Sequence, residues 1–492
     1  MRTNRNVKRI RRAWKFLAAV SCIMAVGSGC QLETAAQEIT TVKMMLLKPY
    51  CSEEEFYHVV EKINERLIEQ LQLRLEIGLV NSGNEELMKY LMDNPDADII
   101  YTGDFQKILT ENLFLPLDDL LQSDGQDILS VLSEEYLIYS RRDGKQYGLP
   151  PKIELASASG VVMRTDLLEK YEIDSKTIQT WDDVGEVLDT IVKNEPDIYG
   201  IVVDLPRQFS PLASSLAMVV EEENKLEAVN YFATADFYEW AERIYDWGQK
   251  EYLYDLANYR YNSGATRGLL YGLMEEGYLF SYMVGYKPGI ADQETKNFDV
   301  LLTKIQITPQ VITNTSYQGE WGIYSRSTHP KEAMRILNFL YSDKEINNLF
   351  CWGIEGEHYQ KDENGRLVLP DGKTQSEYFF NRNWVLPNGY IADVWQGDIP
   401  NLLEEVEKFN DEAEYAPDFE FWFDDSEVQV ETERCLEVIN AYLDGFVCGQ
   451  FDPDEMIPMM LSELEDCGIE RIIQEKQRQL DEWEAQKKNV RG

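Results

Sequence analysis

The sequence predicts an α/β fold with two lobes, followed by a helical C-terminal region. Strand-like and helix-like stretches alternate in two separate blocks, which is typical of α/β lobes. A proline pair, Pro150-Pro151, and a single proline, Pro309, lie between the blocks, so we expect the chain to cross between lobes near both. From Pro400 onward the pattern is mainly helical. A length of 492 residues suits two large lobes better than one ordinary domain.

The start of the chain differs in charge from the rest. Residues 1–29 carry seven basic side chains and no acidic one, whereas residues 30–492 carry 40 basic and 88 acidic side chains. An apolar run of about ten residues follows the basic start, over 17–26. A helix that spans a bilayer needs ~20 apolar residues. The pattern predicts a secretory signal peptide over 1–29.

The residues after the apolar run indicate lipid attachment. Gly27-Ser28-Gly29 precede Cys30 and resemble a bacterial lipobox, although Gly27 stands where an aliphatic residue is usual. We therefore expect cleavage before Cys30, acylation of its thiol, and a polar tether over 30–40. Cleavage at Cys22 and an uncleaved anchor are the alternatives.

The first lobe is predicted from residues 41–152 together with 310–352. A mostly apolar strand spans Thr41 to Leu47, and the spacing of Ser52 and Glu55 is that of a capping box at the start of a helix. Apolar residues then recur with a period near 3.6. The remaining elements of this block complete a mainly parallel sheet: a strand over 73–79, a helix over 84–92 and a buried strand over 98–101.

The second lobe is predicted from residues 153–309 together with 353–492. Its strands are expected over 159–164 and 279–284. Its helices are expected over 166–171, 180–192, 237–247 and 265–277. Residues 364–372 contain two turn signals, Asn364-Gly365 and Asp371-Gly372, and predict a small hairpin.

Composition excludes several classes of function. The formal net charge of -41 argues against a general nucleic-acid binder, because phosphate binding needs clustered positive charge. Only three histidines occur, so we expect neither a multi-histidine metal site nor a metal cofactor. Gly372-Lys373-Thr374 lacks the upstream glycine of a phosphate loop, and neither H-E-x-x-H nor G-x-S-x-G occurs. We expect no cofactor and no catalytic residue.

Five cysteines follow Cys30, and an odd number cannot all pair. Buried free thiols are the expected state. A single bridge, Cys435–Cys448 or Cys448–Cys467, is the alternative.

Several segments resemble the substrate-binding lipoproteins of ABC importers. Lys145-Gln146-Tyr147-Gly148-Leu149-Pro150 is similar to the entry to their second lobe. The stretch 164–171 together with Thr180-Trp181-Asp182-Asp183 resembles the "R-DLLEKYG … TWDD" pattern of family 1 extracellular solute-binding proteins. Residues 341–359 and the tryptophan-containing C-terminal segments resemble a LipO-like subgroup with a DUF3502-type C-terminal region. One departure is Asn388-Gly389-Tyr390, where the subgroup often has Gly-Asn-Gln-Phe.

The resemblance implies a periplasmic-binding-protein-like (type II) clamp that binds a small solute between its lobes. It also implies a monomeric binding protein, not an enzyme, that delivers an oligosaccharide to ABC permease subunits at the extracytoplasmic face of a cell membrane. We expect a neutral oligosaccharide held by aromatic stacking, because an aromatic face covers the apolar face of a sugar ring. An extracellular glycan-active hydrolase and a peptide-binding lipoprotein are the alternatives.

Candidate ligand-binding residues are the aromatic and acidic side chains at predicted strand ends and crossings. They are Tyr50, Asp104, Phe105, Tyr147, Tyr282, Tyr286, Trp321, Trp352 and Trp384. For Trp321 and Trp352, packing beside the hinge is the competing interpretation.

Overall fold

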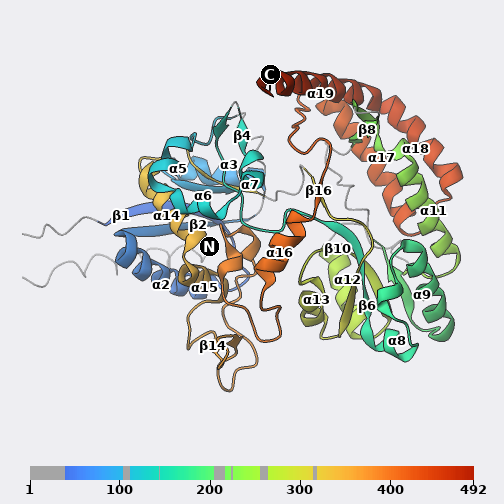
Figure 1. Ribbon diagram of the computed structural model, residues 1–492, viewed down its shortest axis with the longest axis horizontal. Helices are drawn as coiled ribbons and strands as arrows, with labels where there is room; N and C mark the ends of the chain where they lie inside the picture. Colours follow the sequence, from blue (N-terminus) through green and yellow to red (C-terminus); the bar gives the residue numbers. More distant parts are fainter. Residues whose placement is uncertain are drawn as a thin grey trace, which may run out of the picture. The chain divides into compact units, whose positions relative to one another are not determined.

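The computed structural model describes residues 39–81, 83–103, 111–142, 144–203, 216–222, 225–254, 264–313 and 319–491. Residues from Thr40 onward form one compact unit. Within it, two four-stranded sheets each organise a lobe (Figure 1). The expectations for the signal peptide, for Cys30 and for Asp104 and Phe105 concern residues outside this description.

The first lobe is built on a sheet with the strand order β13-β3-β1-β2. Its strands are β1 (Thr40–Leu47), β2 (Leu73–Val80), β3 (Ile99–Thr102) and β13 (Glu320–Ile323). β1 runs parallel to β2 and β3, whereas β13 is antiparallel to β3. The predicted parallel arrangement is therefore confirmed for the first three strands, and a strand from far along the chain completes the edge.

Helices cover this sheet because their apolar side chains pack against the apolar side chains of its strands. α2 (Glu53–Leu71) begins as predicted, with the Ser52 hydroxyl accepting a hydrogen bond from the Glu55 amide at 3.2 Å. α3 (Asn84–Asp93), α14 (Pro330–Ser342) and α15 (Lys344–Trp352) are its other main helices. Both α2 and α14 contact the sheet. Together they bury one continuous apolar core.

The second lobe has a mixed sheet with the order β11-β6-β10-β7. β6 (Ala158–Arg164) is antiparallel to both β10 (Leu279–Tyr286) and β11 (Leu302–Gln306), and β10 is parallel to β7 (Tyr199–Val202). Its main helices are α8 (Thr165–Lys170), α9 (Trp181–Asn194), α11 (Ala235–Gln249), α12 (Gly264–Glu275) and α13 (Ile290–Phe298). α9 starts with a capping box between Thr180 and Asp183.

The C-terminal region is helical but interrupted. α16 (Leu402–Asp411) is followed by a non-helical stretch that contains β16 (Glu414–Tyr415), before α17 (Gln429–Val447), α18 (Pro453–Cys467) and α19 (Ile469–Arg491). α17 and α18 pack on α11, and α19 covers the hairpin of β8 (Ala217–Glu222) and β9 (Lys225–Asn230), as Figure 1 shows. Three buried aromatic and basic groups line this packing: Phe237, Phe446 and Lys476.

The two predicted crossings lie side by side. Ser157 pairs with Val311 in an antiparallel bridge, and β12 (Val311–Ile312) also pairs with β16. The side-chain oxygen of Asn410, in α16, accepts hydrogen bonds from the amides of Leu155 and Ala156, each at 3.0 Å. The connection is therefore held by three separate parts of the chain.

The division of the C-terminal half differs from the sequence prediction. Residues 353–492 were expected in the second lobe, but the buried side chains Tyr378, Phe380, Val385 and Phe409 belong to the core of the first. The cause is that α15 and the loops after it return their apolar side chains to α2. Buried side chains between Val428 and Ile472 belong to the second core.

Candidate functional site

An exposed aromatic cluster follows the first strand of the parallel sheet. Tyr50 comes three residues after the end of β1 and is 61% exposed. Phe379 and Trp384, from the loop after α15, are 57% and 38% exposed. In open α/β sheets ligands bind beyond the carboxyl ends of parallel strands, which is where Tyr50 lies. We call Tyr50, Phe379, Trp384 and the arginine between them, Arg382, the aromatic cluster.

The members of the aromatic cluster contact one another. The rings of Tyr50 and Phe379 meet edge to face with centroids 6.3 Å apart. The Arg382 guanidinium carbon lies 4.7 Å from the centroid of Tyr50 and 6.0 Å from that of Trp384. The structure thus brings together Tyr50 and Trp384, which sequence reasoning nominated, with Phe379 and Arg382, which it missed.

Backbone contacts fix the cluster to the first lobe. Arg382 Nε donates to the Lys48 carbonyl oxygen at 3.2 Å, and the Tyr50 amide donates to the Phe380 carbonyl oxygen at 3.4 Å. Phe380 is buried and stacks on Phe56 of α2, with centroids 6.4 Å apart. The exposed rings therefore stand on a packed base, as a preorganised binding surface requires.

Trp321 lies beneath the cluster, inside the core. Its side chain is 0% exposed, and its indole nitrogen donates to the Val385 carbonyl oxygen at 2.6 Å. Tyr101 packs between the two tryptophans, 5.1 Å from Trp321 and 6.5 Å from Trp384 by ring centroids. Trp321 presents no free face in this structure, and its geometry favours the packing interpretation over a stacking role.

A buried carboxyl group neighbours Trp321. Glu320 is fully buried, beside Ser140 and Arg142. Burial raises its pKa from 4.5 to about 8, against the opposing influence of Ser140 and Arg142. The buried position therefore favours the neutral acid over the carboxylate, because the charged form is poorly solvated there.

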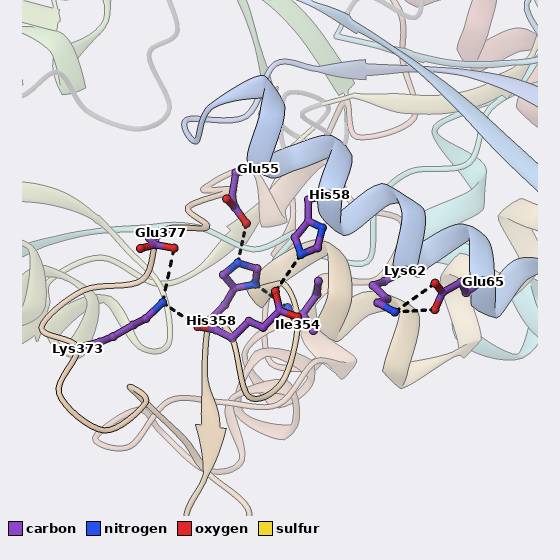
Figure 2. Close-up of polar contacts among 9 residues, drawn as sticks. Glu55, His58, Lys62, Glu65, Ile354, His358, Lys373 and Glu377 are labelled. Carbon is purple, nitrogen blue, oxygen red and sulfur yellow. Dashed lines mark hydrogen bonds and ion pairs between the residues drawn. The ribbon is translucent and has the colours of Figure 1, made fainter. Parts of the chain in front are cut away.

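The start of α2, beside Tyr50, is held by a buried histidine (Figure 2). His358 Nδ1 accepts from the Ile354 amide at 2.8 Å, so its Nε2 carries the proton and donates to Glu55 Oε1 at 2.8 Å. Nearby, His58 Nε2 lies 2.9 Å from Glu357 Oε2. These links tie the loop 354–358 to α2 and so stabilise the segment that follows Tyr50.

The candidates of the second lobe are placed differently. Tyr282 is buried in β10, and its hydroxyl donates to the Glu294 carboxylate. Tyr286, at the end of β10, is half-buried against Phe409, with centroids 6.0 Å apart. The structure does not bring these tyrosines into the aromatic cluster.

Two further candidates lie in the first lobe away from the cluster. Tyr147 is half-buried on the first core. Trp352 is half-buried, its indole nitrogen donates to the Asp393 carbonyl oxygen at 2.8 Å, and its ring meets Trp395 nearly at right angles. Trp352 is thus held by the protein at its ring and at its indole nitrogen.

Sequence reasoning also missed an ion pair at the crossing. Lys287 Nζ, just after β10, lies 2.5 Å from Glu154 Oε1, and the Tyr390 hydroxyl donates to the other oxygen of Glu154. Burial opposes ionisation of Glu154, but the charge of Lys287 and the hydrogen bonds from Lys287 and Tyr390 together outweigh it and lower the pKa of the carboxyl. Tyr390 belongs to the segment that departs from the LipO-like pattern, which was the available signal.

Other expected chemistry can be checked on the described ranges. Cys51, Cys351, Cys435 and Cys467 are free thiols, so neither of the two alternative bridges forms. No group of three or more His, Cys, Asp or Glu side chains in the described ranges could hold a metal ion. No helix among the described residues is long and apolar enough to cross a membrane.

Comparison with known proteins places the chain in a family. The bacterial extracellular solute-binding protein model matches residues 79–346, more than half of the chain, and a domain of unknown function, DUF3502, matches 417–485. A carbohydrate ABC transporter substrate-binding protein of Streptococcus pneumoniae serotype 4 is 23% identical over 443 residues, or 86% of this chain and 87% of the relative.

Solved structures share the fold. The N-glycan transport solute-binding protein NgtS of Streptococcus pneumoniae matches with a TM-score of 0.78 at 21% identity, over 90% of this chain and 98% of that one. A solute-binding protein of Bifidobacterium longum infantis, described as binding HMO, matches with a TM-score of 0.62 at 13% identity, over 90% and 98% of the two chains. The predicted two-lobe α/β fold with a helical C-terminal region is confirmed. The chain therefore belongs to the bacterial extracellular solute-binding protein family.

Proposed function

We propose that this protein is the substrate-binding lipoprotein of an ABC importer and captures an oligosaccharide. The observation that carries the proposal is the aromatic cluster, because three exposed rings stand together beyond the end of a parallel strand. Rings in such a place can stack on sugar faces, while the arginine between them supplies hydrogen-bond donors. The names of the relatives, a carbohydrate transporter component and an N-glycan transport protein, support the same ligand class.

The proposal includes binding without chemistry. Hinge closure over a ligand is the working motion of two-lobe binding proteins, and the paired crossings at Ser157 and Val311 are a suitable hinge. The importer's permease subunits then receive the ligand, and the protein acts as a monomer.

A ligand screen tests the proposal. Neutral oligosaccharides, acidic oligosaccharides and peptides are added to the purified protein, and its melting temperature is followed. A ligand that binds only the native state raises stability by ~2.7 kcal/mol at a hundred times its Kd. We expect a rise with saccharides and none with peptides, and the saccharide should be recovered uncleaved. A response to peptides alone, or recovery of cleaved glycan, would overturn the proposal.

We further propose that Cys30 is acylated and holds the protein at the extracytoplasmic face of the membrane. The basic start, the short apolar run and the small residues before Cys30 support this. Intact mass of the membrane fraction should correspond to a chain that begins at Cys30 and carries acyl groups such as palmitate. The Cys30→Ala variant should lose both the acyl mass and the membrane association, whereas Cys22→Ala should keep both. Retention of both by Cys30→Ala would contradict this assignment.

A further inference from the structure

The guanidinium of Arg382 lies between exposed rings, and no described residue is an acidic partner to it. Within the described chain its one hydrogen bond runs from Nε to the Lys48 carbonyl oxygen, and it takes part in no ion pair. No described residue accepts a hydrogen bond from its two terminal nitrogens. The side chain is half-buried and held in place by the Tyr50 ring and the Lys48 carbonyl, so its orientation is set before a ligand arrives.

Several arginines of this chain are paired with carboxylates. Acidic side chains outnumber basic ones by 88 to 47. Arg66, Arg164 and Arg478 each form a close ion pair with a carboxylate. Arg382 instead contacts two aromatic rings and a backbone carbonyl.

Resting on the proposed function, we infer that the aromatic cluster binds a saccharide that carries a carboxylate, such as a uronic-acid residue. The sugar ring stacks on an exposed ring of the cluster, and the carboxylate accepts hydrogen bonds from the terminal nitrogens of Arg382. A planar guanidinium matches a carboxylate with two parallel, charge-assisted hydrogen bonds. The inference replaces the neutral oligosaccharide expected from the sequence with an acidic one.

The strong negative charge of the chain does not oppose this local contact. Exposed charges are largely screened beyond the Debye length of ~8 Å at physiological ionic strength. At the cluster the carboxylate would lie against the positive charge of Arg382. A polyanion, whose further charges would reach the acidic surface, gains less than a saccharide with one carboxylate.

Matched disaccharides test the inference by titration calorimetry on the full chain. Each pair differs only at C6 of the terminal hexose, which is CH2OH in one member and carboxylate in the other, in the gluco, galacto and manno series. In the series that binds, we expect the acidic member to bind about tenfold more tightly at low salt. This advantage should shrink as salt is raised, whereas the affinity for the neutral member should hardly change.

Two variants of Arg382 and one control identify the residue responsible. Arg382→Gln should remove the advantage of the acidic member, so that the two members of a pair bind with equal affinity. Arg382→Lys keeps the charge without the planar fork and should retain part of the advantage. The control is Arg335→Gln, because Arg335 likewise donates to one backbone carbonyl, that of Leu71 at 3.0 Å, but lies in α14 away from the cluster. It should behave as the parent.

The outcomes separate this inference from the proposed function. Equal affinities within the pairs that bind, or tighter binding of the neutral member, overturn the acidic ligand while saccharide binding stands. Absence of binding by every saccharide overturns both. If Arg382→Gln does not fold, the salt dependence of the matched pairs with the parent protein and with Arg382→Lys still decides.

Discussion

The two lobes present their aromatic side chains in opposite ways. In the first lobe, Tyr50 and Trp384 stand exposed beyond the end of β1, on a base formed by Phe380 and Trp321. In the second lobe, Tyr282 points into the core and its hydroxyl is bound to Glu294. An aromatic residue near a strand end is therefore not by itself a ligand platform. A ligand platform differs from a core residue in two respects, the exposed fraction of its ring and the contacts that hold its backbone in place.

The largest expected effect comes from the base of the cluster. Trp321→Ala removes a fully buried indole and its hydrogen bond to Val385, and should lower the free energy of unfolding by ~3–5 kcal/mol. Denaturant unfolding measures this loss. A loss below ~1 kcal/mol would contradict the assignment of Trp321 to the core.

Glu320, which neighbours Trp321 in the buried base of the cluster, should make stability depend on pH. Its pKa is about 8 in the folded protein against an ordinary 4.5, so the folded state retains a proton that the unfolded state releases between these values. Stability should therefore fall as pH rises through this window, by up to ~1.4 kcal/mol per pH unit.

Glu320→Gln removes that titration. Its stability relative to the parent should rise from pH 5 to pH 8, measured by denaturant unfolding at each pH, while the two proteins converge below pH 4.5. Parallel profiles of parent and variant would show that Glu320 is ionised in the folded protein.

Substitution of the exposed rings should weaken ligand binding and leave stability nearly unchanged, which is the opposite of the effect expected for Trp321→Ala. Tyr50→Ala or Trp384→Ala should cost ~2 kcal/mol of ligand binding, about thirtyfold in affinity, with little change in melting temperature. Tyr278→Ala is the matched control, because Tyr278 is 48% exposed but precedes β10 at the opposite end of a strand. Equal losses of affinity in all three variants would contradict the assignment of ligand binding to the aromatic cluster.

The smallest effect is expected in the second lobe. Tyr282→Phe removes only the hydroxyl that donates to Glu294 and should lower stability by ~1 kcal/mol. Ligand affinity should remain that of the parent. A loss of affinity without a loss of stability would show that Tyr282 faces the ligand and that the two lobes are more alike than their exposed surfaces suggest.

Local signals in the sequence predicted much of the fold. Ser52 caps a helix where its spacing to Glu55 indicated, a helix follows Thr180 as predicted, and the alternation over 73–79 is part of β2. These elements depend on neighbours in the sequence. The hairpin β8–β9 was not predicted, because its apolar residues are covered by α19 from the other end of the chain.

The candidate site was predictable only in part for the same reason. Tyr50 could be placed at a strand end from its position after β1. That Arg382 would lie 4.7 Å from its ring depends on the loop after α15 returning to the first core. No local pattern reports such a contact, so Phe379 and Arg382 were missed.

The edge strand β13 has a consequence for how the protein is made. The first lobe begins at Thr40, but its sheet and core lack β13, α14 and α15 until residues up to 352 have been synthesised. Contacts between such distant residues slow folding, because a long loop must close before they form. The first lobe therefore stays incomplete while the strands of the second lobe are synthesised. Chains truncated before β13 should therefore be captured by proteases or chaperones rather than accumulate as a folded half.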